Sequence, residues 1–214
     1  PVKIADDGTV TYADTNKSWY DYCDKVWANA VILNDGVSYN IGDTIKESDI
    51  QSYFVWIPKY KYKLWNTGTA SKNIHEIDIV FDTTDTTDIS GVSCKTPMAS
   101  GASGNCKNGE YMTHPAFISM GVNGFWAGKF ETGYKGATSA TAAQVNSNDS
   151  SKIIIKPNSY SWINSTVMNK FTASYNYKRA MNSHMMKNTE WGAVAYLSHS
   201  KYGINAEVNI NNNS

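Results

Sequence analysis

Short alternating runs of apolar and polar residues fill the first third of the chain, a pattern typical of β-strands that bury one face. Val2–Ile4 and residues 9–12 flank the turn sequence DDG at residues 6–8, and this order predicts a β-hairpin. Aromatic and aliphatic residues dominate positions 19–33, and the turn sequence NDG follows them. We expect another strand pair there.

The strongest strand pattern lies at residues 53–65, YFVWIPKYKYKLW. After Pro58, lysines alternate with Tyr60, Tyr62 and Leu64, which predicts a solvated lysine face and a packed aromatic face. Pro58 has no N–H to donate to a neighbouring strand, so we expect an edge or a bulge at this residue. No nucleic-acid partner is expected, because rings that stack on bases and lysines that pair with phosphates would point to opposite faces.

Three further strands are predicted in the second half of the chain. They lie at residues 114–117, at residues 125–131 and at residues 153–155, of which the last is short and fully apolar. The alternation of the middle strand places Trp126 and Phe130 on the same face.

Two helices follow these strands. Apolar residues recur at helical spacing from residue 167 to residue 175, which predicts a helix capped by Asn164 or Ser165 and ending near Met181. Its apolar positions are Val167, Met168, Phe171 and Tyr175.

The second helix is expected at residues 188–203, with Asn188 or Thr189 as the cap and Glu190 in the first turn, where a carboxylate favours the helix dipole. Its predicted buried stripe consists of Trp191, Val194, Ala195 and Ser198, with Leu197 beside it. The small residues at 192, 193 and 195 would allow another element to pack closely. We expect Trp126, Trp162 and Trp191 to share one interior with both helices.

The composition is typical of a surface protein that binds its partner through local contacts rather than through net charge. The 214 residues contain 19 Lys plus Arg and 19 Asp plus Glu, so the mean field attracts neither nucleic acid nor an anionic membrane. Aromatic residues make up 13% of the chain, and Asn, Ser and Thr supply much of its polarity, a mixture typical of adaptable contact surfaces. No run approaches the roughly 18 apolar residues that span a bilayer, so no direct membrane insertion is expected in this segment.

Three cysteines leave at least one without a disulfide partner. Cys94 and Cys106 flank a loop of small residues that would bring both sulfurs within bridging distance, and we expect a disulfide; two reduced thiols are the alternative. Cys23 lies among aromatic neighbours, where a buried and unreactive thiol is expected.

The sequence DTTDTTD at residues 82–88 is the one candidate for a metal site. Its three aspartates, Asp82, Asp85 and Asp88, would offer oxygen ligands to calcium, but the glycine and the bidentate glutamate of an EF-hand loop are lacking. A solvated loop is the favoured interpretation, so no cofactor is expected and calcium stays a possibility.

No recognisable catalytic motif is present. His184 and His199 flank a helix of more than three turns, so that helix cannot bring both to one metal ion. The nucleophile-elbow pattern G-x-S-x-G is absent from the sequence. We therefore expect a chain without enzymatic activity.

Three ordered blocks carry a resemblance to a known family: FWAGKFET at residues 125–132, Pro157 with Ser161 and Trp162, and NTEWGAVAYL at residues 188–197. The set resembles the domain shared by formylglycine-generating enzymes, also called sulfatase-modifying factors, and related C-type-lectin-like proteins. That group includes retroelement-diversified variable proteins and bacterial or prophage surface and pilin-associated proteins.

The resemblance implies an α+β, C-type-lectin-like fold with a twisted antiparallel sheet, two helices and long loops. It covers residues 53–214, so residues 1–52 are expected to form a separate β-rich segment. The C-terminal sequence NINNNS closes no strand or helix, and the domain is expected to be incomplete there.

The departures from the family decide the functional hypothesis. Formylglycine-generating enzymes bind copper through an oxidising cysteine pair near their C-terminus, whereas Cys94 and Cys106 lie too early and in another context. We expect a non-enzymatic binding or adhesion domain, extracellular and displayed on a bacterial surface, a pilus or a phage tail (virion), with a protein or glycan as partner. A truncated oxidoreductase of that family and a structural pilin-like subunit are the alternatives.

Residues in predicted loops are the candidate ligand contacts, because polar and aromatic side chains there are free to meet a target. They are Tyr134, Asn146, Asn148, Tyr202 and Asn205.

Overall fold

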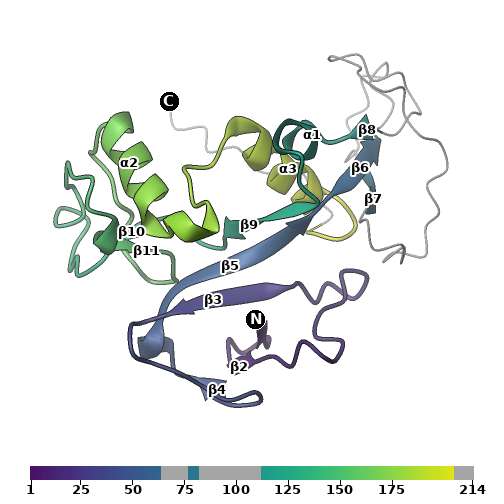
Figure 1. The fold of residues 1–214 in the computed structure, drawn as a ribbon, viewed down its shortest axis with the longest axis horizontal. Helices are drawn as coiled ribbons and strands as arrows, with labels where there is room; N and C mark the ends of the chain where they lie inside the picture. Colours follow the sequence, from purple (N-terminus) through teal and green to yellow (C-terminus); the bar gives the residue numbers. More distant parts are fainter. Residues whose placement is uncertain (64–76, 82–111, 205–214) are drawn as a thin grey trace. The chain divides into compact units, whose positions relative to one another are not determined.

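The computed structural model describes residues 1–63, 77–81 and 112–204, and the fold is mixed α+β (Figure 1). It divides into two compact units. Unit 1 comprises Pro1–Tyr20, Ala28–Trp56 and Trp126–Met186, and unit 2 comprises Asp21–Trp27, Ile57–Phe125 and Lys187–Ser214. The boundary expected between residues 52 and 53 falls inside a single strand, β5 (Ile50–Pro58), so the structure divides the chain differently.

A six-stranded sheet forms the framework of unit 1, in the order β4-β2-β1-β3-β5-β9. Its other strands are β1 (Val2–Ile4), β2 (Val10–Tyr12), β3 (Asn29–Leu33), β4 (Thr44–Ile45) and β9 (Gly124–Gly128). The hairpin predicted at the start of the chain is confirmed, since β1 and β2 pair antiparallel with Val2 opposite Tyr12. Gly8 has a φ of 87° in the connecting turn, a conformation that glycine adopts without strain.

Strand β5 separates two hydrophobic clusters. Tyr53 belongs to a cluster with Val2 and Val10, whereas the next residue, Phe54, packs against a cluster that contains Ile153 and Trp162. Consecutive side chains of a strand point to opposite faces of the sheet. The sheet of unit 1 therefore has a core on each face.

The second cluster is built from short elements that follow the sheet along the chain. Strand β10 (Gly133–Tyr134) pairs antiparallel with β11 (Ile153–Ile154), which follows the 3-10 helix η2 (Ser150–Lys152). The predicted buried strand at residues 153–155 is confirmed, because Ile153 and Ile155 are buried and Ile155 bridges Ser52 of β5.

The first predicted helix is present as α2 (Val167–Tyr177), followed by the 3-10 helix η3 (Arg179–Met181). Its cap is Thr166 rather than the expected Asn164 or Ser165, with Thr166 Oγ1 accepting from Asn169 N at 3.2 Å. The 3-10 helix η1 (Glu47–Asp49) leads into β5.

The hypothesis that Trp126, Trp162 and Trp191 share one interior is wrong. Trp162 is 6% exposed, but Trp126 is 45% and Trp191 63% exposed. The ring of Trp126 packs on Trp56 at 5.3 Å between centroids with its plane tilted by 58°, and Trp191 is not among the buried residues of its helix. A tryptophan is large enough to contribute packing area while much of its ring stays in solvent.

Unit 2 contains a three-stranded sheet in the order β7-β6-β8. Its strands are β6 (Tyr60–Lys63), β7 (Asp78–Phe81) and β8 (Met112–Thr113). Tyr60 and Tyr62 are buried while Lys61 and Lys63 are partly exposed, which confirms the predicted alternation. Strand β5 ends at Pro58, where the sequence predicts a break.

The strand expected at residues 114–117 is not formed. These residues instead are the cap and the first turn of helix α1 (Pro115–Met120). Pro115 occupies the first helical position, where its missing N–H costs no hydrogen bond. His114 Nδ1 accepts from Ala116 N at 3.3 Å, and Gly121 ends the helix with a φ of 63°. Both ends are thus set by local chemistry.

Helix α3 (Asn188–His199) confirms the second predicted helix, but its buried stripe differs from the expected one. The buried residues are Glu190, Ala193 and Leu197, one position away from the predicted stripe. Glu190 is tolerated inside because its Oε2 accepts from Lys187 N at 2.7 Å. Close packing on the small residues is confirmed, since the Tyr60 hydroxyl donates to the Ala193 carbonyl at 2.7 Å.

Candidate binding surface

Trp162 anchors the polar loop between β10 and β11. Its indole Nε1 donates to the Val145 carbonyl at 2.6 Å, and its ring meets Tyr134 edge-on at 5.1 Å between centroids. Next to it, Ile163 N donates to the Ala143 carbonyl at 3.3 Å. These contacts hold residues 143–149 against the segment that enters α2. We call residues 143–149 and 164–166 together the loop surface.

Asn146 joins the two halves of the loop surface. Its Oδ1 accepts from Thr166 N at 3.0 Å, from Asn169 Nδ2 at 2.8 Å and from Ser165 Oγ at 3.4 Å. Ser165 Oγ also lies 3.3 Å from the Ser147 carbonyl, to which it donates. Asn146 therefore fixes the loop to the first turn of the helix. Within the described part of the chain, its Nδ2 group has no hydrogen-bond partner.

An open hollow of about 420 Å³ lies on this surface. It is lined by Asn146, Asn164, Ser165 and Thr166, all neutral and polar. Asn164 has a φ of 57°, a left-handed conformation that asparagine tolerates better than most residues, and this backbone turn leads into the capping residue of α2. The hollow offers amide and hydroxyl groups and no charge, which suits an uncharged polar ligand.

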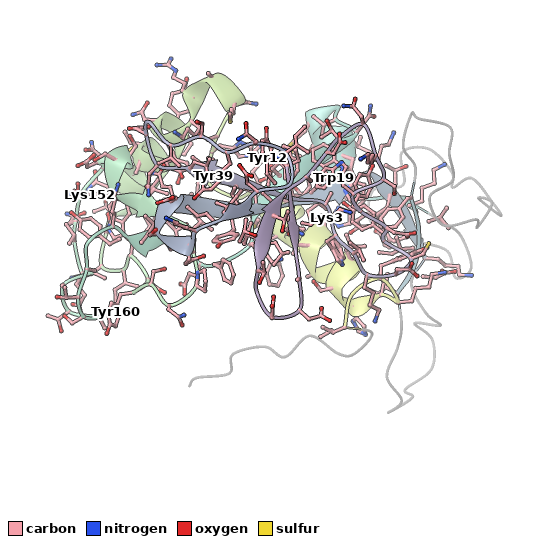
Figure 2. The ribbon with its side chains drawn as sticks, turned by 90° about the horizontal axis from the view of Figure 1, so that it is seen from below. Lys3, Tyr12, Trp19, Tyr39, Lys152 and Tyr160 are labelled. Atoms are coloured by element: carbon pink, nitrogen blue, oxygen red, sulfur yellow. The ribbon has the colours of Figure 1, made fainter. Side chains whose placement is uncertain are left out.

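The far end of the loop is held by Asp149. Its Oδ1 accepts from Ser151 N at 3.0 Å and from Ser151 Oγ at 2.7 Å, and these hydrogen bonds lower the pKa of the Asp149 carboxyl. Lys152 lies 6.0 Å from the centre of the Tyr134 ring. Figure 2 shows Lys152 and Tyr160 at the same end of unit 1, and Tyr160 is exposed there.

The structure brings three of the five predicted contact residues into this region. Asn146 and Asn148 are exposed, and Tyr134 is half-buried against Trp162. Tyr202 is only 2% exposed and packs on Phe81 at 4.7 Å between centroids in unit 2, so the expectation of an exposed loop tyrosine is wrong. Asn205 lies outside the described residues.

Other expected sites fall outside the described residues as well. They are the cysteines Cys94 and Cys106 and the aspartates Asp82, Asp85 and Asp88. Cys23, expected to be buried, is exposed. In residues 1–63, 77–81 and 112–204, no group of three or more His, Cys, Asp or Glu side chains is arranged to hold a metal ion.

His114, in the described part of unit 2, has a strongly lowered pKa. His114 is buried among Tyr60, Tyr62, Phe117 and Tyr196, with ring centroids 5.3 to 6.1 Å from its own. Burial lowers the pKa of His114 from 6.5 to about 4, because the charged imidazolium would lose its hydration. The ring is therefore neutral at pH 7 and serves as a helix cap and a packing group.

The sequence does not predict the hollow, because Asn164 and Ser165 indicate only the start of a helix. These two residues predict a cap, and the structure places the cap one residue later, at Thr166. What the sequence does not reveal is the contact with Asn146, about twenty residues earlier, which turns a cap into one wall of a surface hollow.

Comparison with models of known protein families, with curated protein sequences and with solved structures gives no match for this chain. No family assignment follows from these comparisons. In the described part of the chain, no helix has the length and apolar character needed to cross a membrane.

Proposed function

We propose that this chain is a non-enzymatic, surface-displayed binding domain that contacts a protein or a glycan outside the cell. The observation that supports the proposal most directly is the loop surface, where Asn146 is exposed and yet held by three hydrogen bonds. A surface fixed before it meets a ligand loses little conformational freedom on binding. A bacterial surface, a pilus-associated structure and a phage tail are the settings that fit such a domain.

We further propose that the domain is C-type-lectin-like. The antiparallel sheet of unit 1, the packing of α2 on it and the long connection between β10 and β11 support this assignment. In such an arrangement the sheet and the helix bury the apolar side chains, while the loops provide the contacts.

The ligand class follows from the groups that line the hollow. The amide of Asn146 and the hydroxyls of Ser165 and Thr166 match the hydrogen-bonding groups of a sugar or of a peptide backbone. Exposed Tyr160 at the same end of the unit adds an apolar ring that keeps a polar tip. A neutral glycan or an uncharged peptide segment is therefore the proposed ligand, and a phosphorylated one is not.

Binding to arrays tests this proposal. The labelled chain is applied to a glycan array and to an array of surface-protein peptides, with the heat-denatured chain as the control. We expect specific binding to neutral members of one array, in the micromolar range of about 1 to 100 µM that is typical of shallow polar sites. Binding to neither array, or binding that the denatured chain reproduces, would exclude the proposal.

A further inference from the structure

The hydrogen bonds of Asn146 fix which end of its carboxamide is free for a ligand. A backbone N–H can only donate, so the atom of Asn146 that lies 3.0 Å from Thr166 N is the oxygen, Oδ1. Asn169 Nδ2 donates to the same oxygen at 2.8 Å. The carboxamide cannot be turned over, because its Nδ2 group would then meet the N–H of Thr166 with a second donor.

The oxygen of Asn146 has no capacity left for a ligand. A carboxamide oxygen has two lone pairs, and Thr166 N and Asn169 Nδ2 use both, while Ser165 Oγ adds a longer contact of 3.4 Å. The Nδ2 group carries two N–H donors, and neither has a partner among the residues that the structure describes. Asn146 is exposed and lines the hollow, so it offers a ligand donors and no acceptor.

Thr166 also offers a donor to the hollow. Its Oγ1 accepts from Asn169 N at 3.2 Å, which leaves the hydroxyl proton without an acceptor in the described part of the chain. The proton of the neighbouring Ser165 hydroxyl is already used, since Ser165 Oγ donates to the Ser147 carbonyl at 3.3 Å. Two of the four lining residues thus present free protons in positions that the fold determines.

An acceptor without a proton of its own complements such a lining. The carbonyl oxygen of a neutral amide meets this requirement, because it accepts two hydrogen bonds and brings no donor. A sugar hydroxyl fits less well, since its proton needs an acceptor, and Asn164 is the one lining carboxamide whose oxygen is not already used. A carboxylate is a strong acceptor, but no Lys or Arg lines the hollow to balance its charge.

The rest of the lining favours an amide carried by a sugar over one in a peptide. A peptide bound as a strand is held by alternating donors and acceptors and by pockets for its side chains. The hollow is open, and its lining is neutral and polar, so it has no apolar pocket for a side chain. Ile163 and Val167 flank the lining residues 164–166 in the chain and are 40% and 72% exposed, enough for contact with a single methyl group. The volume of about 420 Å³ lies within the range of about 300 to 1,000 Å³ that is usual for small-molecule sites.

We propose that the hollow recognises the acetamido group of an N-acetylated sugar. The carbonyl oxygen of that group accepts from Asn146 Nδ2 and from the Thr166 hydroxyl, and its methyl group contacts Ile163 or Val167. This specificity rests on the proposed function and narrows it from neutral glycans to those that contain an N-acetylated amino sugar. Asn146 determines the specificity, because its carboxamide is held with the donors free.

Two pairs of monosaccharides test the proposal: N-acetylglucosamine with glucose, and N-acetylgalactosamine with galactose. The members of a pair differ only at C2, where an acetamido group replaces a hydroxyl, so a difference in affinity reports on that group. Each sugar is titrated to about 50 mM into the ¹⁵N-labelled chain, which covers the millimolar Kd values of weak sites. We expect the N-acetylated member of at least one pair to bind about fivefold more tightly than its counterpart. The same sugar should shift the side-chain NH₂ signals of Asn146, which are identified by their loss in Asn146→Asp.

The variant Asn146→Asp tests the donor itself. Its carboxylate keeps an oxygen for Thr166 N and Asn169 Nδ2 but has no N–H, so the preference for the N-acetylated sugar should disappear. Asn16→Asp adds the same charge at an exposed position of another loop and should keep the preference of the parent. Circular dichroism melts show that both variants are folded, and the comparison of sugars on the parent chain needs no variant.

The outcomes separate this specificity from the proposed function. Equal affinity within both pairs, together with glycan binding on the arrays, would overturn the acetamido assignment and leave the proposed function in place. A preference that Asn146→Asp retains would also overturn it. Tighter binding of the blocked dipeptide N-acetylglycylglycine amide than of any sugar would assign the recognised amide to a peptide instead. No binding to any sugar, to the dipeptide or to the arrays would exclude both proposals.

Discussion

The hydroxyl groups of Ser52 and Tyr177 lie 2.7 Å apart and determine which face of α2 meets the sheet. Ser52 is fully buried in β5, and its Oγ also accepts from Ile155 N at 3.0 Å. The contact therefore joins a strand, a helix and the chain after β11. Since Tyr177 points inward, the residues on the other side of the helix point into solvent.

Replacement of Ser52 by alanine is expected to cost more stability than replacement of Tyr177 by phenylalanine. Ser52→Ala leaves the N–H of Ile155 and the hydroxyl of Tyr177 without this partner. The free energy of unfolding should fall by about 1 to 3 kcal/mol. Tyr177→Phe removes one hydrogen bond while Ile155 N keeps its acceptor, and it should lower the free energy of unfolding by about 1 kcal/mol. Urea unfolding measures both, and Tyr175→Phe on the exposed face should stay within about 0.5 kcal/mol of the parent. Equal losses for Ser52→Ala and Tyr175→Phe would contradict the assigned geometry.

Asn146 offers a substitution that separates structure from recognition. Asn146→Ala removes the acceptor used by Thr166 N and Asn169 Nδ2 and should destabilise unit 1 by about 1 to 2 kcal/mol. Asn146→Asp keeps an acceptor oxygen beside the start of α2, where a carboxylate is favourable, and should unfold close to the parent. Thermal unfolding followed by circular dichroism makes the comparison. Similar melting points for the alanine variant and the parent would show that the three hydrogen bonds are not formed in solution.

Replacement of Trp162 should cost more stability than replacement of Trp126, the half-exposed tryptophan of unit 1. Trp162→Phe keeps an aromatic ring but loses the donor to the Val145 carbonyl and part of the buried area, an expected loss of about 2 kcal/mol. Trp126→Phe, at a half-exposed position, should cost less than about 1 kcal/mol. Guanidinium unfolding monitored by far-ultraviolet circular dichroism avoids the loss of the fluorescence probe. The reverse order of the two losses would argue against Trp162 as the anchor of the loop.

His114 makes the stability of unit 2 depend on pH. Its pKa falls from 6.5 in the unfolded chain to about 4 in the folded one, so folding favours the neutral ring. The stability that unit 2 gains from the neutral His114 ring is fully present above pH 6.5. It is lost as the pH falls toward 4, by at most about 1.4 kcal/mol for each pH unit. Unfolding free energies between pH 7 and pH 4 should therefore decline less steeply in His114→Gln than in the parent. Identical slopes in His114→Gln and in the parent would contradict the burial of His114.

The sequence predicted the elements whose signals are local. The hairpin at the start of the chain follows from a turn between two short strands, and the alternation of Tyr60 and Tyr62 with lysines follows from strand geometry. The sequence at residues 114–117 predicts a strand, because four residues are too few to show a helical period. Pro115 is compatible with a strand entry as well as with a first helical turn.

Helix packing was predicted less well, for a physical reason. Hydropathy predicts that Trp191 of α3 is buried and that Glu190 is exposed. The structure shows the reverse, and burial of Glu190 is tolerated because its carboxylate accepts a hydrogen bond from the N–H of Lys187. The apolar residues of α2 point outward because Ala173 and Tyr177 fit the sheet and Ser52 offers a hydroxyl partner. Such preferences depend on the partner surface, which periodicity does not contain.

The candidate site was predictable as a loop but not as a hollow. The polarity of Asn146 and Asn148 in a predicted loop indicates surface contacts, and both residues are exposed. The contact between Trp162 and Val145 joins residues 17 positions apart in the sequence. Tyr202 follows the end of α3, and its burial is not evident from the sequence. The position of a polar residue relative to a core decides its role, and the sequence shows only its type.

Binding by matched asparagine variants tests the proposed function most directly. The ligand that binds the parent most tightly on the arrays is titrated against Asn146→Asp and against Asn16→Asp, which makes the same chemical change at an exposed position of another loop. With both variants folded, Asn146→Asp should bind at least about tenfold more weakly, since the amide donor over the hollow is lost, whereas Asn16→Asp should match the parent. Equal affinity for all three proteins would contradict the assignment of the loop surface as the binding site.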